Sequence, residues 1–145
     1  MRTVVIGSGS WGTALAQVLQ DNHQEVMIYG VAEAEVNDIN DNHKNSKYFA
    51  DVELNPELRA TTDIQCVKGA DIVLLAVPTI AIDPICHQIN DLLDKKTIII
   101  NVSKGFHPDT NERMSEVIRR CIDEDKLSSV VSLIGPSHEI GRAHV

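Results

Sequence analysis

Short apolar or alternating runs occur along the chain between segments in which apolar residues recur every three or four positions. The runs have the length of strands, and the other segments have the spacing of amphipathic helices. Strands are predicted over residues 3–6, 25–29, 71–77, 97–102 and 129–134, with a further short strand near 58–60. Helices are predicted over residues 11–19, 32–42 and 62–68, after Pro78, and after a cap formed by Asp109 and Glu112.

Three of these helices gather apolar side chains on one face, which we expect to be buried. The faces consist of Leu15, Val18 and Leu19; of Ile82, Ile85, Ile89 and Leu92; and of Met114, Val117, Ile118 and Cys121. The alternation of strands and helices predicts an α/β fold of the Rossmann type. Its doubly wound, mostly parallel sheet has six or seven strands and helices on both faces. Ligands of such sheets bind outside the carboxyl ends of the strands.

The first strand runs directly into a G-x-G-x-x-G motif made by Gly7, Gly9 and Gly12. The first glycine permits a tight turn, the second lets a pyrophosphate approach the backbone, and the third lets the helix pack closely on the strand. The N-terminus of the helix then offers unpaired N–H groups to the phosphates. We therefore expect a dinucleotide site here; the alternative is a glycine-rich turn with a purely structural role.

The other loops at this edge of the sheet supply further candidate residues. Ser10 can donate a hydroxyl to a phosphate, and Trp11 either forms a wall of the cofactor site or packs against a neighbouring loop. Pro78 either lines the site or only ends a strand. Lys104 follows a buried strand between small residues, so we favour a ligand-binding role over that of an ordinary surface lysine. In 135–138, Gly135 allows close approach, Ser137 can bond a ligand, and His138 either acts in acid–base chemistry or is solvated.

The choice between NAD and NADP stays open at this stage. An acidic residue at the end of the second strand binds the ribose 2′-hydroxyl, and an arginine there accommodates a 2′-phosphate. The chain has neither at this point: Tyr29 and Gly30 end the strand, and Glu33 is interpreted as a solvated residue of the next helix.

Composition narrows the classes of partner. The 145 residues carry a formal net charge of −8, which argues against nucleic acid and anionic membranes. No apolar run is long enough to cross a bilayer, and a polar loop from residue 7 interrupts any signal peptide. Three scattered cysteines indicate a reducing cytoplasm and buried, unpaired thiols. The histidines show no metal-ligand spacing, so no metal site is expected.

Taken together, the motifs resemble the NAD(P)-dependent glycerol-3-phosphate dehydrogenases of bacteria. The resemblance runs from residue 2 to about 138. It is carried by Gly7-Ser8-Gly9-Ser10-Trp11-Gly12-Thr13-Ala14-Leu15-Ala16, Ile39-Asn40…His43…Asn45…Tyr48, Ala60-Thr61-Thr62-Asp63, Gly69-Ala70-Asp71, Ala76-Val77-Pro78-Thr79, Val102-Ser103-Lys104-Gly105 and Gly135-Pro136-Ser137-His138.

The resemblance implies hydride transfer between a nicotinamide, NAD or NADP, and dihydroxyacetone phosphate, giving sn-glycerol 3-phosphate for phospholipid synthesis. By motif position, the implied cofactor contacts are Gly7, Gly9, Ser10, Trp11, Gly12, Tyr48, Pro78 and Lys104. The implied substrate contacts are Lys104, Gly135 and Ser137. A homodimer is implied for the full-length form. Many members have an arginine just after the second strand, where this chain has Gly30 and Val31, so NADP preference is in doubt.

In the family, a helical domain with a catalytic lysine and the substrate phosphate site follows the Gly-Pro-Ser-His motif. We therefore expect residues 1–138 to be the NAD(P)-binding domain, 139–145 to be a non-native tail, and no catalytic residue to lie in this chain. Two other functions stay open: another NAD(P)-dependent dehydrogenase of hydroxy acids or sugar acids, and a standalone NAD(H)-sensing module.

Overall fold

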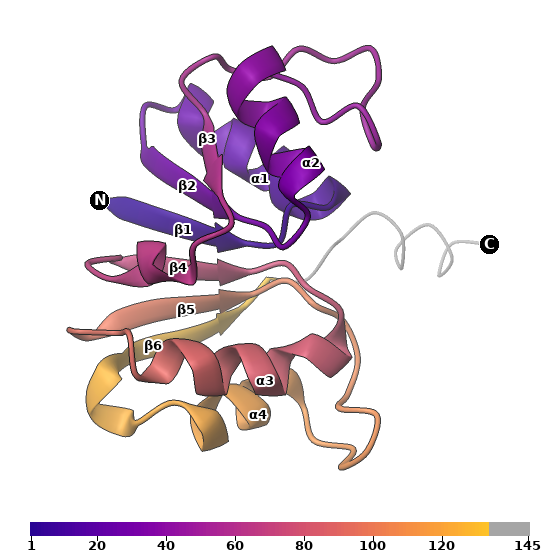
Figure 1. The fold of residues 1–145 in the computed structure, drawn as a ribbon. Coiled ribbons are helices and arrows are strands. Elements are labelled where there is room, and N and C mark those ends of the chain that lie inside the picture. Colours follow the sequence, from indigo (N-terminus) through magenta and orange to yellow (C-terminus); the bar gives the residue numbers. More distant parts are fainter. Residues whose placement is uncertain (134–145) are drawn as a thin grey trace, which may run out of the picture.

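A computed structural model describes residues 1–133, which form a parallel sheet with helices packed against it (Figure 1). The strands of this described part are β1 (Arg2–Ile6), β2 (Glu25–Tyr29), β3 (Arg59–Thr61), β4 (Ile72–Leu75), β5 (Thr97–Asn101) and β6 (Leu127–Ser132). The α-helices are α1 (Ser10–Asp21), α2 (Glu33–Asn37), α3 (Thr79–Asn90) and α4 (Met114–Cys121). A π-helical turn, Asp38–Asn42, extends α2, and single 3₁₀ turns cover Ile64–Val67 and Glu124–Lys126.

The strand order is β3-β2-β1-β4-β5-β6, and every neighbouring pair is parallel. The chain starts in the middle of the sheet, builds outward to β3, and then returns to β4 on the other side of β1. Val4 of β1 consequently lies opposite both Met27 and Val73. A crevice opens where the direction of winding changes, outside the carboxyl ends of β1 and β4. The predicted Rossmann-type, doubly wound sheet is confirmed, with six strands in the described residues.

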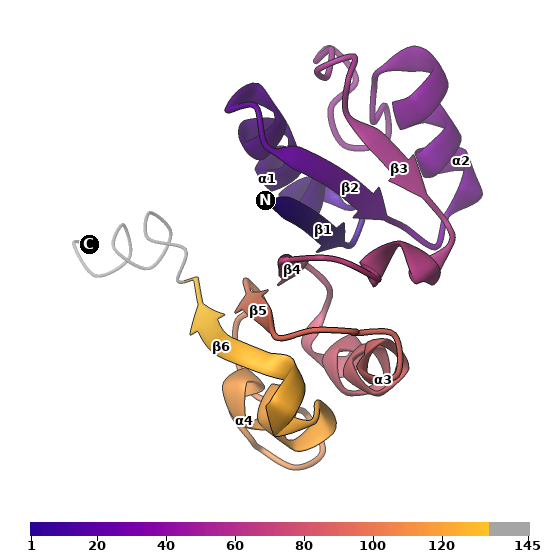
Figure 2. The same ribbon diagram turned by 90° about the vertical axis from the view of Figure 1, so that its left-hand side faces the viewer.

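Two apolar cores cover the two faces of the sheet because successive strand residues point to opposite sides. Val4 and Ile6 of β1 face the core that holds the buried residues of α3 and α4, whereas Val5 faces the core of α1 and α2. Figures 1 and 2 show α1 and α2 beside the β1–β3 half and α3 and α4 beside the β4–β6 half. This double cover explains why the central strands are apolar without alternation.

Two local expectations are wrong. Val18 is 56% exposed, because α1 packs closely on the sheet through its small residues Gly12, Thr13 and Ala16. Helix α4 begins at Met114 and not after Asp109; Arg113 is its N-cap, and the Arg113 N–H bonds the Glu116 carboxylate at 3.1 Å.

The expected boundary at residue 138 and the tail 139–145 lie outside the described residues, so they stay predictions. Within residues 1–133, no helix is both long and apolar enough to span a membrane.

Candidate functional site

A cleft of about 1050 Å³ lies outside the carboxyl ends of the strands. Its walls come from the loops that follow β1, β2, β4 and β5, from Leu133 after β6, and from Lys47 and Tyr48 in the irregular segment 43–58. Loops far apart in the sequence meet here because parallel strands end at the same edge of a sheet. The cleft is therefore where the strand order predicts a ligand.

The glycine loop at the floor of the cleft leaves no room for side chains at two points. Gly7 has a φ of +120°, and a Cβ there would lie 2.3 Å from the carbonyl oxygen of Ala76. A Cβ on Gly12 would lie 2.0 Å from the carbonyl oxygen of Gly7. These contacts hold β1, α1 and the end of β4 together, and they bear out the close packing expected of Gly12.

The N-terminus of α1 opens into the cleft without a cap from the described residues. Gly9 is the N-cap residue, no described side chain bonds to the exposed N–H groups, and the first turn holds no acidic residue. A Cβ on Gly9 would meet nothing closer than the Tyr48 hydroxyl at 3.9 Å. The end of the helix therefore presents unpaired N–H groups and a partial positive charge to open space.

A buried asparagine fixes this loop from the irregular segment. Asn45 is 0% exposed, and its Nδ2 donates to the Ser8 carbonyl at 2.8 Å and to the Thr13 hydroxyl at 2.9 Å. The Thr13 hydroxyl bonds the same carbonyl at 3.3 Å. Asn45 thus ties the segment that supplies Lys47 and Tyr48 to the glycine loop. In the sequence, the only sign of this role was that Asn45 belongs to one of the motifs that carry the family resemblance.

A carboxylate that sequence reasoning missed stands on the β2 side of the cleft. Glu35 of α2 lines the cleft, and its side chain is only 14% exposed. It accepts a 2.7 Å hydrogen bond from the Ser8 hydroxyl and forms a 3.6 Å ion pair with Lys47. Glu33 is exposed, as its interpretation as a solvated helix residue requires, whereas Glu35, two residues further along α2, lines the cleft.

The β4 and β5 loops form the opposite wall. Pro78 follows β4 and is the N-cap residue of α3, and the Ser103 hydroxyl donates a hydrogen bond to the Val77 carbonyl, which joins the two loops. Lys104 lines the cleft and is exposed at its rim.

The structure brings most of the predicted residues together. Gly7, Gly9, Ser10, Trp11, Tyr48, Pro78 and Lys104 all line the cleft, and Gly12 packs behind the glycine loop. Trp11, the only tryptophan, lines the cleft and is 59% exposed. Gly135 and Ser137 lie outside the described residues.

The cysteines are unpaired, as expected. Burial raises the pKa of Cys86 to about 12 and that of Cys66 to about 11, so both thiols are protonated at neutral pH. A protonated thiol is a poor nucleophile, and neither residue lines the cleft.

Comparison with known proteins identifies this architecture. A sequence model described as "NAD-dependent glycerol-3-phosphate dehydrogenase N-terminus" matches residues 2–144. Glycerol-3-phosphate dehydrogenase [NAD(P)+] of Listeria monocytogenes serotype 4b is 46% identical over 138 residues, covering 94% of this chain and 41% of the relative. The protein of the same name from Macrococcus caseolyticus is 45% identical, covering 95% of this chain and 42% of the relative.

Solved structures agree. Glycerol-3-phosphate dehydrogenase of Saccharomyces cerevisiae superposes with a TM-score of 0.80 at 26% identity, covering 99% of this chain and 44% of that structure. The Coxiella burnetii enzyme gives 0.78 at 26% identity, covering 92% and 39%. The chain spans about two fifths of the length of these relatives. It belongs to the NAD-dependent glycerol-3-phosphate dehydrogenase family and corresponds to the N-terminal part of its members.

Proposed function

We propose that the cleft binds a nicotinamide dinucleotide, and that the chain serves as the cofactor-binding part of an NAD(P)-dependent glycerol-3-phosphate dehydrogenase. The reaction is the interconversion of dihydroxyacetone phosphate and sn-glycerol 3-phosphate. One observation carries the proposal: the uncapped N-terminus of α1 follows a glycine loop that excludes side chains at Gly7 and Gly12, and it opens into a cleft where the winding of the sheet changes direction.

The residues present fit the pyrophosphate of such a cofactor. Two phosphates need hydrogen-bond donors and positive potential, and the first turn of α1 offers both. The missing side chain of Gly9 leaves the approach open, and Ser10, which lines the cleft, carries a hydroxyl that can donate to a phosphate oxygen. These local groups offset the unfavourable net charge of −8.

The residues on the β2 side of the cleft favour NAD over NADP. Glu35 is held on this side of the cleft by Ser8 and Lys47, where a carboxylate can accept hydrogen bonds from ribose hydroxyls. The same carboxylate would repel a 2′-phosphate. Lys47 does not reverse this preference, because its ammonium is already paired with Glu35.

The other wall fits the nicotinamide end. Ala76, Val77, Ala81 and Ile85 give it an apolar surface that excludes water from one face of a flat ring. The bound nicotinamide would supply or accept the hydride. Lys104, at the rim of this wall, carries an ammonium that can bind oxygen atoms of a phosphorylated three-carbon substrate.

Gly135 and Ser137 complete the proposed substrate contacts by motif position. We propose that the longer relatives supply the proton-donating lysine and the phosphate site from the part that this chain does not match. The homodimer of the longer form and the cytoplasmic location also stay predictions, which light scattering and cell fractionation would check.

Calorimetric titration of the 145-residue chain with NADH and NADPH tests the proposal. We expect saturable binding of one nucleotide per chain, tighter for NADH. The chain alone should not oxidise NADH when dihydroxyacetone phosphate is added. A lack of binding to either nucleotide would contradict the proposal. Measurable turnover would contradict the statement that the proton-donating lysine comes from the part that this chain does not match.

The Lys104→Met variant distinguishes the alternative functions because methionine keeps the length of the stem but removes the charge. In a sensing module Lys104 would matter little. In a dehydrogenase, the same substitution in a chimera that joins residues 1–133 to the remainder of the Listeria relative should lower turnover of dihydroxyacetone phosphate strongly. A panel of hydroxy acids and sugar acids with the unsubstituted chimera addresses the other dehydrogenases.

A further inference from the structure

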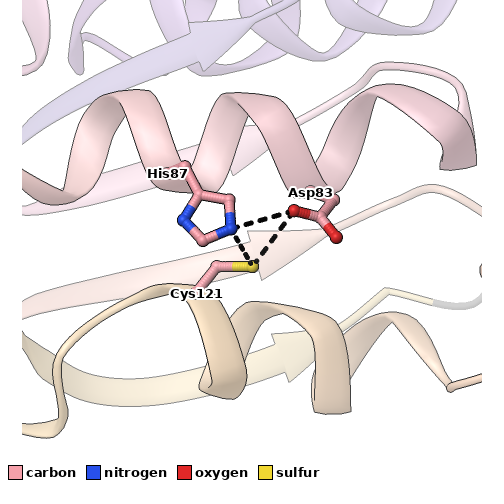
Figure 3. Close-up of side chains that lie close together, drawn as sticks. All are labelled: Asp83, His87 and Cys121. Atoms are coloured by element: carbon pink, nitrogen blue, oxygen red, sulfur yellow. Dashed lines mark hydrogen bonds and ion pairs between the residues drawn. The ribbon is translucent and has the colours of Figure 1, made fainter.

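Three potential metal ligands meet between α3 and α4, on the side of the domain that the proposed function does not use. Asp83 and His87 lie one turn apart on α3, and Cys121 is the last residue of α4. Figure 3 shows the three side chains pointing towards one another across the helix interface. Their donor atoms all lie within 4.8 Å of one another.

The spacing of the donor atoms is close to that of ligands around a tetrahedral ion. Asp83 Oδ1 lies 3.1 Å from His87 Nε2, Cys121 Sγ lies 3.6 Å from Asp83 Oδ1, and Cys121 Sγ lies 3.5 Å from His87 Nε2. Zinc binds sulfur at about 2.3 Å, nitrogen at about 2.0–2.1 Å and oxygen at about 2.0–2.2 Å, which separates tetrahedral ligands by about 3.3–3.6 Å. The two separations that involve sulfur fall in this range and the oxygen–nitrogen separation is slightly shorter, so a small movement of the side chains would make the three atoms one face of a zinc-sized tetrahedron with water at the fourth position.

The carboxylate of Asp83 is already oriented for this role. Its other oxygen, Oδ2, accepts a 3.0 Å hydrogen bond from Arg120 and lies 3.6 Å from His107 Nε2. The Nδ1 atom of His107 accepts N–H bonds from Asp109 and Thr110, so Nε2 carries the proton and points at Asp83. Supporting hydrogen bonds of this kind orient ligands in known metal sites. Oδ1 is left facing His87 and Cys121.

The charges around the cluster also suit a divalent ion. The positive charge of Arg120 is offset by two carboxylates, because its guanidinium binds Glu112 at 2.8 Å and Asp83 at 3.0 Å; its Nη1 also lies 3.7 Å from Cys121 Sγ. While the Cys121 thiol is protonated, the two carboxylates of Asp83 and Glu112 and the one guanidinium of Arg120 leave a net charge of −1. A Zn²⁺ ion that displaces the Cys121 proton to solvent brings the sum of Zn²⁺, Asp83, Glu112, Arg120 and the thiolate to zero. The site is reachable, since the His87 side chain is 62% exposed.

We propose that Asp83, His87 and Cys121 form a binding site for a thiophilic divalent cation, Zn²⁺ in particular, that clamps α3 to α4. A mixed set of sulfur, nitrogen and oxygen donors selects zinc over magnesium or calcium. This departs from the expectation of no metal, which rested on the spacing of the histidines alone; here one histidine is joined by an aspartate and by a cysteine 34 residues beyond it.

Metal titration of the reduced, EDTA-treated 145-residue chain tests the site. Zn²⁺ is titrated in competition with a chelating dye, and Co²⁺ is used as a spectroscopic probe because a thiolate ligand gives it a sulfur-to-metal charge-transfer band. We expect one ion per chain, the thiolate band with Co²⁺, and a higher unfolding temperature with Zn²⁺. Binding of no ion, or of an ion without the thiolate band, would overturn the proposal.

Matched variants assign the ligands. His87→Gln alters an exposed side chain and should leave the fold intact while weakening Zn²⁺ binding by at least about tenfold, since even the loss of a supporting bond costs about 10–100-fold. Cys121→Ser should abolish the Co²⁺ thiolate band. The controls are His23→Asn and Cys66→Ala, which remove a histidine and a cysteine elsewhere and should bind like the unsubstituted chain. Equal losses of Zn²⁺ affinity in the control variants and in the Asp83–His87–Cys121 variants would show non-specific binding and reject the site.

Discussion

Gly9 and Gly12 lie three residues apart in one motif, yet the structure gives them different roles. A Cβ on Gly12 would collide with the backbone of Gly7 at 2.0 Å, whereas a Cβ on Gly9 would project into the cleft with its nearest neighbour at 3.9 Å. Gly9 also has φ −76° and ψ −167°, which any residue adopts. One glycine is therefore required by packing, and the other only by the ligand.

Alanine at each position separates the two roles. Gly12→Ala forces the backbone apart and should lower the free energy of unfolding by about 1–3 kcal/mol, the usual cost of overpacking. Gly9→Ala should lower it by no more than about 1 kcal/mol, because alanine is a poorer N-cap than glycine but its methyl collides with nothing. Its added methyl should nevertheless weaken NADH binding at least about tenfold, which is about 1.4 kcal/mol.

Urea unfolding and quenching of Trp11 fluorescence measure these two effects. Trp11 is the only tryptophan and lines the cleft, so its emission reports a bound nucleotide directly. Full NADH affinity in Gly9→Ala would place the pyrophosphate elsewhere.

Glu35 is the second residue whose effect can be isolated. Glu35→Gln keeps the shape of the side chain and an acceptor oxygen for Ser8, but it removes the charge that repels a 2′-phosphate. It also releases Lys47 from its 3.6 Å ion pair. We expect the ratio of NADPH to NADH affinity to rise at least about tenfold, equivalent to about 1.4 kcal/mol.

Calorimetry with both nucleotides gives this ratio. Glu33→Gln is the matched control because Glu33 is exposed at the start of the same helix and does not line the cleft. An unchanged ratio in Glu35→Gln, or an equal change in Glu33→Gln, would assign cofactor choice to other residues.

At the scale of elements, one carboxylate links the start of the sheet to the connection before β5. Asp71 precedes β4; it accepts a 2.6 Å hydrogen bond from Lys95 and a 2.8 Å bond from the Arg2 N–H. The bond from Lys95, followed by that from Arg2, holds the pKa of Asp71 below its ordinary value. The ionised form is thus favoured in the folded chain.

This shift predicts a pH dependence of stability with a definite sign. A carboxyl whose pKa is lowered by folding stabilises fully above its unfolded pKa, about 3.9, and loses that effect as the pH falls through its folded pKa. Asp71→Asn should therefore be less stable than the unsubstituted chain near pH 6, and the gap should close towards acid pH.

Urea unfolding between pH 6 and pH 3 measures the gap. Asp125→Asn, an exposed carboxylate, is the control for a general effect of lost charge. A gap that stays constant or widens on acidification would contradict the assigned role of Asp71.

At the scale of the whole molecule, the sequence predicted what depends on local periodicity and missed what depends on how elements dock. Strand β2 has the predicted limits because the alternation of Val26 and Ile28 is a property of the strand itself. Val18 fits the apolar spacing of α1 as well as Leu15 does, but the close approach through Gly12 turns it outward. Local spacing carries no information on such a rotation.

The site residues that the sequence did not predict were missed for the same physical reason. Glu35 enters the cleft through the orientation of α2, and Asn45 reaches the glycine loop from a segment without periodicity. The Asp83–His87 pair has helical i, i+4 spacing that a search for ligand pairs could have found. Cys121 joins it only when α3 packs on α4.

Ligand binding at the cleft should stabilise the domain as a whole. The cleft touches the ends of five strands, so a nucleotide seated there contacts both halves of the sheet and binds the folded chain alone. At a concentration 100 times its Kd, such a ligand adds about 2.7 kcal/mol to the free energy of unfolding. For a chain of this size that corresponds to a rise of about 5–10 °C in Tm.

Differential scanning calorimetry with NADH should show this rise in the unsubstituted chain and a much smaller one in Gly9→Ala at the same concentration. Adenosine, which lacks the pyrophosphate and the nicotinamide, should give little. An equal rise with adenosine would mean that the uncapped end of α1, with its free N–H groups, is not what the nucleotide binds.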